Sequence, residues 1–172
     1  MLWVFWIVIG LPILHILMRN MLTMKQEKVS KIFLPIDELF LKRYVLIPDL
    51  IAVAKDYLKD EKAIISELEM IHGEAFYTFL SDDQKVLMDN RISTPIAKLL
   101  KFMKGCPGLS DDKEALDNRV TLEELEQKID ALRGSYNLAV SDFNDSVVHF
   151  PMNFVASLMD LRPKEKFKLK KD

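Results

Sequence analysis

The residues best suited to chemistry in this chain include one Glu-x-x-His pair. Glu69 and His72 are three residues apart, so both side chains lie on one face of a helix. That spacing fits half of a carboxylate-bridged di-metal site, which needs a second Glu-x-x-His motif and two further inward-facing Glu residues. Of the other histidines, His149 has Ser146 three residues before it, and His15 lies in the apolar N-terminal segment. The sequence therefore favours a solvated surface pair over a metal site.

Nucleophilic and acid–base chemistry has little support. The single cysteine, Cys106, cannot form an internal disulfide, and it follows a predicted helix C-terminus, where the helix dipole disfavours a thiolate. Adjacent acids such as Asp82-Asp83 and Glu123-Glu124 point in different directions and are better explained as helix-start residues. No nucleophile elbow, phosphate loop or dinucleotide fingerprint is present in the sequence. We expect no catalytic residues, no cofactor and no metal.

Composition indicates a folded, helical body. The 172 residues are 49% hydrophobic and 29% charged, which is unlike a disordered tail or a multi-span membrane protein. Only 5 glycines and 7 prolines occur, too few for the many tight turns of an all-β fold. The net charge is −2, and the central residues 25–160 are more acidic than basic. Nucleic-acid binding is therefore not expected.

The first 18 residues, Met1 to Met18, contain no charged side chain. As a helix they would span about 27 Å, close to the hydrocarbon thickness of a bilayer, and Arg19 could snorkel to its surface. A cleaved signal peptide and a buried core helix are the alternatives. Cleavage is disfavoured because no basic residue precedes the apolar run and no small-x-small site follows it. We expect residues 1–24 to form a transmembrane anchor.

The charges flanking this segment predict its orientation. Arg19, Lys25, Lys28 and Lys31 follow the apolar run, whereas only the terminal amine precedes it. By the positive-inside rule, the protein crosses the cell membrane once, with its N-terminus outside and its body in the cytoplasm. A large domain can also be translocated by other means, so the opposite orientation remains an alternative.

The clearest periodic segment lies near the C-terminus, where apolar residues recur every three or four positions from Leu122 to Phe150. This spacing predicts one long amphipathic helix. Thr121 has capping-box spacing with Glu124, although Asp111 or Asp112 could start the helix earlier, and Pro151 ends or kinks it. The core is expected to include the aromatic stripe Tyr136, Phe143 and Phe150. Other faces are expected to carry the charged residues Glu123, Glu124, Glu126, Lys128, Asp130, Arg133 and Asp142.

Two further helical segments are predicted. An apolar stripe runs from Leu50 to Phe79, and Pro48 either opens this helix or kinks a longer one arriving from the membrane. Ser81-Asp82-Asp83-Gln84 is a capping-box pattern that starts a segment ending at Gly105, within which Thr94-Pro95 could restart the helix. The predicted fold is all-α: an N-terminal transmembrane helix (residues 1–24), an antiparallel four-helix bundle with coiled-coil-like packing (25–160) and a basic tail (161–172).

Two segments of the chain resemble the LemA family. Residues 41–51, Leu-Lys-Arg-Tyr-Val-Leu-Ile-Pro-Asp-Leu-Ile, are similar to its Arg-Tyr-x-Leu-Ile-Pro-Asn-Leu-Val segment. The second segment resembles the family at Leu132-Arg133, Tyr136-Asn137, Val140, Phe143-Asn144, Phe150-Pro151 and Ala156. The chain departs from the family at Val45, Asp49, Phe143 and residues 159–161. The resemblance implies a membrane-anchored four-helix bundle with no established catalytic residues.

Polar residues beside the apolar stripes form a candidate network. Asn137 and Asn144 are seven residues apart, on nearly one line of the last helix, and they follow Tyr136 and Phe143 in the sequence. Arg43 and Tyr44 could meet them from an earlier helix. We expect a buried polar network of Arg43, Tyr44, Tyr136, Asn137 and Asn144 that fixes helix register. A ligand pocket and simple exposure are the alternatives.

The C-terminal tail is a candidate lipid-facing segment. Four antiparallel helices after an anchor would return the chain to the bilayer, where each basic residue contributes up to about 1 kcal/mol at an anionic surface. A solvated, disordered tail is the alternative. The basic residues concerned are Arg162, Lys164, Lys166, Lys168, Lys170 and Lys171.

These features predict a membrane-tethered, non-catalytic interaction or scaffolding module. Its expected partners are the lipid bilayer and another membrane or envelope protein. The acidic body would favour a basic surface on that partner protein. One alternative is a protein that organises the lipid surface through its anchor and tail, and another is an enzyme whose site is assembled from dispersed residues. No oligomeric state is predicted.

Overall fold

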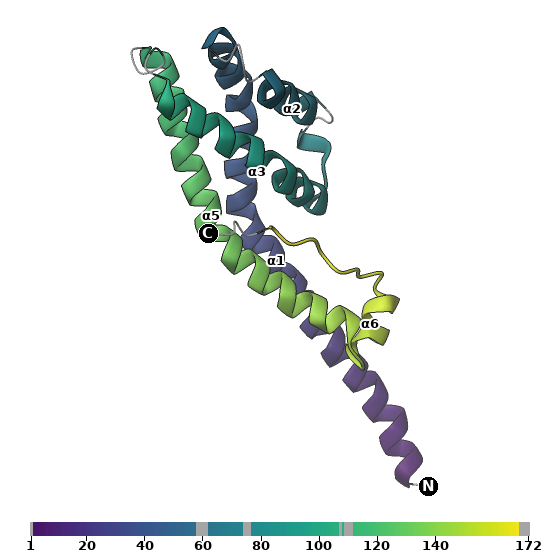
Figure 1. The fold of residues 1–172 in the computed structure, drawn as a ribbon. Helices are drawn as coiled ribbons and strands as arrows, with labels where there is room; N and C mark the ends of the chain where they lie inside the picture. Colours follow the sequence, from purple (N-terminus) through teal and green to yellow (C-terminus); the bar gives the residue numbers. More distant parts are fainter. Residues whose placement is uncertain (1, 58–61, 74–76, 107, 109–111, 169–172) are drawn as a thin grey trace. The chain divides into compact units, whose positions relative to one another are not determined.

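All regular structure is helical in the computed structural model, which describes residues 2–57, 62–73, 77–106, 108 and 112–168, with side chains from residue 9 onward. A 3-10 turn, η1 (Tyr77–Phe79), precedes α3, and no strand occurs in these ranges (Figure 1). The predicted all-α class is therefore confirmed. The helices are α1 (Leu2–Tyr57), α2 (Lys62–Gly73), α3 (Asp82–Gly105), α5 (Lys113–Val148) and α6 (Met152–Leu158).

The chain forms two compact units. Unit 1 comprises Met1–Phe33 and Ser135–Lys166, and unit 2 comprises Leu34–Gly134 and Phe167–Asp172. Helices α1 and α5 each contribute residues to both units. The predicted division into anchor, bundle and tail at residues 24 and 160 stays a prediction.

A hydrophobic core in unit 2 is built from four helices. Its buried residues include Leu50 on α1, Leu68 on α2, Ile96 on α3 and Leu122 on α5, each at most 2% exposed. Each of these helices has an apolar stripe at three- and four-residue spacing, and packing the stripes together removes them from water. This core confirms the prediction of a helical bundle.

In unit 1, α1 and α5 pack in opposite directions. Phe33 lies against Tyr136 with ring centroids 5.6 Å apart. Eight residues earlier on α1, the Lys25 ammonium is 2.7 Å from the Asp142 carboxylate and 2.8 Å from the Ser146 hydroxyl, both later on α5. As one helix advances the other recedes, so the pair is antiparallel. The buried residues of this unit include Leu22, Val29, Phe33, Tyr136, Ala139, Val140, Phe143, Val147, Val155 and Ala156.

Helix α1 is continuous through Pro48, where the sequence allowed either the start of a new helix or a kink in a longer one. Pro48 lies inside this helix, so the interpretation that it opens a new helix is wrong, and a longer helix does arrive there. Pro12 and Pro35 also lie within α1. Likewise, α3 continues through Pro95 rather than restarting there. A proline inside a helix removes one backbone hydrogen bond, and packing of the apolar face outweighs that loss here.

The predicted helix from Leu50 to Phe79 is wrong as a single element. Its first part is the end of α1, its middle is α2, and Tyr77–Phe79 form a 3-10 turn. Residues 58–61 and 74–76 of this predicted helix lie outside the described residues. The same apolar spacing continues in α1 and α2 because both helices bury their stripes in one core.

The capping residues of α3 and α5 can be compared with the predicted helix starts. Ser81 caps α3 with a full capping box, since its hydroxyl accepts from the Gln84 N–H and the Gln84 side chain accepts from the Ser81 N–H. For α5, the earlier of the two predicted starts is correct: the Asp112 carboxylate accepts from the Ala115 N–H, and Thr121 lies inside the helix.

Among the described residues, no helix contains a stretch long and apolar enough to cross a membrane. The predicted anchor, residues 1–24, includes Met1 and the side chains of residues 2–8, which lie outside the described part of the chain.

Candidate functional site: a buried ionic cluster

Four charged residues form the most unusual cluster in unit 2, here called the ionic cluster: Arg43 on α1, Asp89 on α3, and Glu126 and Arg133 on α5. Each residue is at most 6% exposed. Charged side chains are almost never buried unless they are paired, so their partners decide what the cluster can do.

Helical spacing explains why these charges point inward. Arg43 is three residues after buried Phe40 and four before buried Ile47, so it shares their face of α1. Asp89 is flanked in the same way by Val86 and Ile92 on α3. On α5, Glu126 and Arg133 are seven residues apart, two helical turns, and lie beside the buried Ile129. Each charge therefore occupies a core position of its helix.

The charges neutralise one another through short contacts. The Arg43 guanidinium donates to Asp89 at 2.8 Å and to Glu126 at 2.8 Å. Arg133 approaches the same Asp89 carboxylate, 2.7 Å from Oδ2 and 3.0 Å from Oδ1. Arg133 also donates to the Ser93 hydroxyl at 2.8 Å and to the carboxylate of Asp130 on its own helix. Two cations and two anions are thus buried together in balanced charge.

Electrostatics hold Arg43 firmly in its charged form. Burial alone lowers the pKa of a guanidinium, but the neighbouring Asp89 and Glu126 carboxylates more than compensate and raise the pKa of Arg43 above its ordinary value. Aromatic rings complete the surroundings. The Arg43 guanidinium carbon lies 4.8 Å from the centre of the Phe40 ring, and that of Arg133 lies 5.8 Å from the centre of the Phe167 ring.

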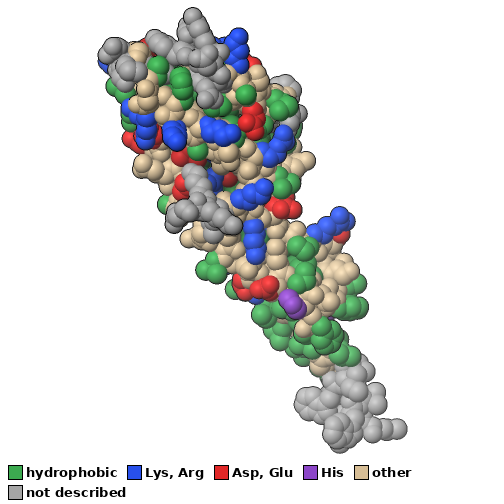
Figure 2. Space-filling view, viewed as in Figure 1, with side chains coloured by type: hydrophobic (Ala, Val, Ile, Leu, Met, Phe, Trp, Pro, Cys, Tyr) green, Lys and Arg blue, Asp and Glu red, His purple; other side chains and the backbone are tan. Residues whose placement is uncertain are grey.

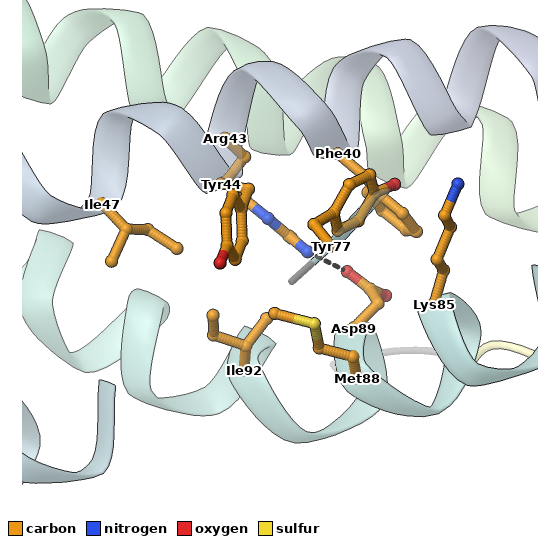
Figure 3. Close-up of a pocket in the computed structure, with 9 residues that line it drawn as sticks. All are labelled: Phe40, Arg43, Tyr44, Ile47, Tyr77, Lys85, Met88, Asp89 and Ile92. Atoms are coloured by element: carbon orange, nitrogen blue, oxygen red, sulfur yellow. Dashed lines mark ion pairs between the residues drawn. The ribbon is translucent and has the colours of Figure 1, made fainter. Parts of the chain in front are cut away.

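A small cavity of about 10 Å³ adjoins the cluster, which is room for about one water molecule (Figure 3). Figure 3 shows Arg43 and Asp89 pointing toward each other across it, with the Tyr44 and Tyr77 rings beside the guanidinium. The lining residues are Phe40, Arg43, Tyr44, Ile47, Tyr77, Lys85, Met88, Asp89 and Ile92. The Asp89 carboxylate at this cavity is already paired with two arginines, and the space does not admit a substrate.

Tyr77 and Lys85, which line the same cavity, both contact Asp37. The Tyr77 hydroxyl donates to the Asp37 carboxylate, and the Lys85 ammonium lies 2.7 and 2.9 Å from its two oxygens. Burial raises the pKa of Tyr77 well above its ordinary value, and the hydrogen bond to the negatively charged Asp37 raises it further. This group joins α1, η1 and α3 within unit 2.

The residues predicted to form one polar network are divided between the two units. In unit 2, Arg43 belongs to the ionic cluster, and the Tyr44 ring stacks on His72 at 4.1 Å while its hydroxyl donates to the His72 carbonyl at 3.2 Å. In unit 1, Tyr136 is fully buried beside Phe33 and Asn137 is half-buried.

Asn144 makes a two-point contact in unit 1. Its side-chain amide donates to the Lys164 carbonyl at 2.9 Å, and its oxygen accepts from the Lys164 N–H at 2.7 Å. An asparagine side chain that satisfies both backbone groups of one residue holds that residue as a strand neighbour would. Asn144 therefore fixes the chain after α6 against α5.

Of the basic tail residues, the structure describes Arg162, Lys164, Lys166 and Lys168. Arg162 is exposed and lies 3.4 Å from Asp160, and the Lys166 ammonium donates to the Ser141 hydroxyl at 3.2 Å. In unit 2, the Lys168 N–H donates to the Asn90 side chain at 2.6 Å, beside the buried Phe167. Lys170 and Lys171 lie outside the described residues. Contact of the tail with lipid stays a prediction.

Glu69 and His72, the pair predicted from the Glu-x-x-His spacing, each contact a different residue. Glu69 forms an exposed ion pair with Lys55 at 2.6 Å, and the His72 ring nitrogen Nε2 is 3.1 Å from the Tyr44 carbonyl. In the described part of the chain, no three His, Cys, Asp or Glu side chains gather into a group that could hold a metal ion.

Sequence reasoning missed three members of the ionic cluster. Glu126 and Arg133 were expected on faces of α5 other than its apolar stripe, and that expectation is wrong because both are buried in the core. Asp89 was not singled out. The available signal was position: each charge lies three or four residues from apolar residues of its own stripe.

Comparison with known proteins agrees with the resemblance described above. The family model for the LemA family matches residues 33–172. No curated protein sequence matches the chain closely enough to count as a relative. The family match covers most of the chain, including every residue of the ionic cluster, and the protein therefore belongs to the LemA family.

Proposed function

We propose that this chain is a single-pass membrane protein whose helical body acts as a non-catalytic interaction or scaffolding module at the cytoplasmic face. One observation carries the membrane part: apolar side chains near the start of α1 are exposed. Leu11 is 62% exposed, Leu14 49% and Leu17 56%. At 3.6 residues per turn, these positions and their exposed neighbours Ile13 and Ile16 spread over about 220° of the helix circumference, far more than the roughly 100° stripe of a helix packed on one side.

A helix with so broad an apolar surface is stable only where that surface meets apolar material. The charge-free run from Met1 to Met18 supplies the length for a bilayer, and Arg19, Lys28 and Lys31 beyond it are exposed. Basic residues on this side favour a cytoplasmic body.

The ionic cluster supports a non-catalytic role. General acid–base or nucleophilic chemistry needs a group that can reach a substrate and change its protonation state. Asp89 and Glu126 are instead buried and held by two arginines, and the cavity that Asp89 lines has room for about one water molecule. Their geometry fits a structural device that aligns α1, α3 and α5.

An open apolar groove in unit 2 supports binding of another membrane protein. It has a volume of about 460 Å³, and two exposed residues, Leu41 and Val45, lie along it. Confinement to one membrane raises the effective concentration of a partner that is held there too. The lining residues are Leu41, Lys42, Val45, Leu46, Asp49, Thr121 and Leu125.

Membrane attachment is tested by extraction of membranes with alkaline carbonate, followed by flotation. The wild-type chain should stay with the lipid. Introducing two arginines by Leu11→Arg and Leu14→Arg costs about 5–7 kcal/mol at the bilayer centre and should release the protein. Leu34→Arg with Leu41→Arg is the matched control, since these leucines on the same helix are 62% and 43% exposed. Extraction of the wild type, or equal behaviour of the two variants, would contradict the proposal.

The interaction role is tested by a photoreactive amino acid at Val45 in native membranes. We expect a discrete crosslink to a membrane protein, and we expect it to disappear with the Leu11→Arg and Leu14→Arg changes, which remove the tether. Met70 on α2 is exposed to a similar degree, 58% against 65% for Val45, and serves as the control. Equal crosslinking from both positions, or crosslinking that does not depend on the anchor, would contradict a tethered module.

A further inference from the structure

We infer that the corner between α5 and α6 is a second membrane contact, which inserts into the interfacial layer of the bilayer next to the anchor. The inference rests on the proposed function, since it needs the first residues of α1 to be in the membrane. The apolar corner is defined by four exposed residues of unit 1: Val148, Phe150, Phe154 and Leu158.

The apolar corner presents large hydrophobic side chains to the outside. Phe150 is 86% exposed, Phe154 66%, Leu158 65% and Val148 51%. Phe150 was expected in the core with the rest of its aromatic stripe, and that expectation is wrong because α5 ends at Val148, before the stripe does. Figure 2 shows hydrophobic side chains gathered over this end of unit 1.

The exposure is not a consequence of poor packing. Helix α6 buries Val155 and Ala156, which are 3% and 1% exposed, so its inner face is occupied. Phe154 and Leu158 are four residues apart and share the other face. A short helix that is packed on one side and apolar on the other has the pattern of an element lying at a membrane interface.

The register of α1 and α5 places this corner at the level of the bilayer surface. Lys25 contacts Asp142 and Ser146, and Phe33 contacts Tyr136, in an antiparallel pair. Continued at the helical rise of about 1.5 Å per residue, that register brings Phe150 roughly level with Arg19. Arg19 is the first charged residue after the apolar run of α1.

The local charges suit this position. From Ser146 to Met159 the sequence contains no Asp, Glu, Lys or Arg, so inserting the corner desolvates no formal charge. Arg162 follows α6 and is exposed, where it can meet headgroup phosphates. Helices that lie in the membrane interface commonly turn Phe and Leu toward the lipid. Lipid therefore fits this surface better than a second copy of the chain, which would leave the exposed apolar residues of α1 uncovered.

The test places a spin label on the full chain in nanodiscs of mixed neutral and anionic lipid. Phe150→Cys and Phe154→Cys are each made in a Cys106→Ser background, and oxygen and a water-soluble nickel complex report the surroundings of the label. Leu138→Cys is the matched control: it is an exposed apolar residue of α5 in the same unit, 75% exposed, but about 15 Å along the helix from its end at Val148.

We expect the ratio of oxygen to nickel accessibility to be several-fold higher at residues 150 and 154 than at residue 138, because oxygen concentrates in lipid and the nickel complex in water. Three results would overturn the inference: equal ratios at the three positions, shielding from both reagents, or dipolar broadening that shows a second copy. Flotation of the labelled protein is measured in parallel. A chain that floats while its corner stays in water contradicts this inference alone, whereas a chain that does not float contradicts the proposed function.

Discussion

Arg43 and Asp89 form an ion pair of 2.8 Å between α1 and α3, with side chains only 5% and 1% exposed. Asp89 also receives Arg133 from α5, so one carboxylate joins three helices. Burying such charges is costly, and replacing a whole buried cluster by apolar residues is often neutral or stabilising. We expect the cluster to align the three helices, because another register would separate a buried charge from its partner.

Asp89→Asn is therefore expected to be strongly destabilising, because it leaves Arg43 and Arg133 close together without the negative charge between them. We expect a loss of about 3–5 kcal/mol in the free energy of unfolding, measured by urea unfolding in detergent. Glu124→Gln is the control, since its 3.4 Å pair with Lys128 is exposed and should contribute less than about 1 kcal/mol. Similar losses in the two variants would contradict a buried cluster.

The raised pKa of Tyr77 predicts that the free energy of unfolding decreases at alkaline pH. The Tyr77 pKa is raised by burial and by Asp37 in the folded chain, so the folded state keeps a proton that the unfolded state releases near pH 10. The stability that this group contributes is complete below about pH 10 and falls above it, by about 1.4 kcal/mol per pH unit. Unfolding measured from about pH 9 to pH 11 should show a smaller decline in Tyr77→Phe than in the wild type. Parallel declines would show that Tyr77 ionises without difficulty in the folded protein.

Phe167 anchors the C-terminal segment in unit 2. It is 3% exposed and meets the Phe40 ring edge-on, with centroids 5.8 Å apart. Phe167→Ala should cost about 3–5 kcal/mol of unfolding free energy by leaving a cavity next to Arg133. Phe79→Ala, which truncates a side chain that is 85% exposed, should change it by less than about 0.5 kcal/mol. A neutral Phe167→Ala variant would mean that this segment is not docked in solution.

The hydrogen bonds between Asn144 and the Lys164 backbone predict that the chain around Lys164 is protected from proteases. Removing both amide hydrogen bonds by Asn144→Ala should expose this segment and speed tryptic cleavage after Lys164 and Lys166 by about tenfold. Leu138→Ala truncates a residue of the same helix that is 75% exposed and should leave the cleavage rate unchanged. Cleavage that is equally fast in the wild type would contradict the contact between Asn144 and the segment after α6.

The helices were largely predictable because their signals are local. The capping box at Ser81, the cap at Asp112 and the long apolar stripe of α5 each depend on residues within a few positions of one another. The break between α1 and α2 was not predictable, because the apolar spacing continues in both helices.

The pairing of charges within the ionic cluster was beyond prediction for a different reason. A pattern search that counts only apolar residues assigns Glu126 and Arg133 to a polar face, and nothing in the sequence of α5 reveals that Arg43 and Asp89 will meet them. The same holds for Phe167, one aromatic residue among lysines with no periodic neighbours. Pairing between distant helices depends on their alignment, which no local pattern carries.

The most direct test of the account is the sidedness of the body in living cells. A single reporter cysteine replaces exposed Met70 in a Cys106→Ser background, and an impermeant thiol reagent is applied before and after lysis. Membrane-bound protein that is labelled only after lysis is the predicted result, and it would place the body at the cytoplasmic face. Labelling in intact cells, or protein recovered free of the membrane, would contradict the central claim.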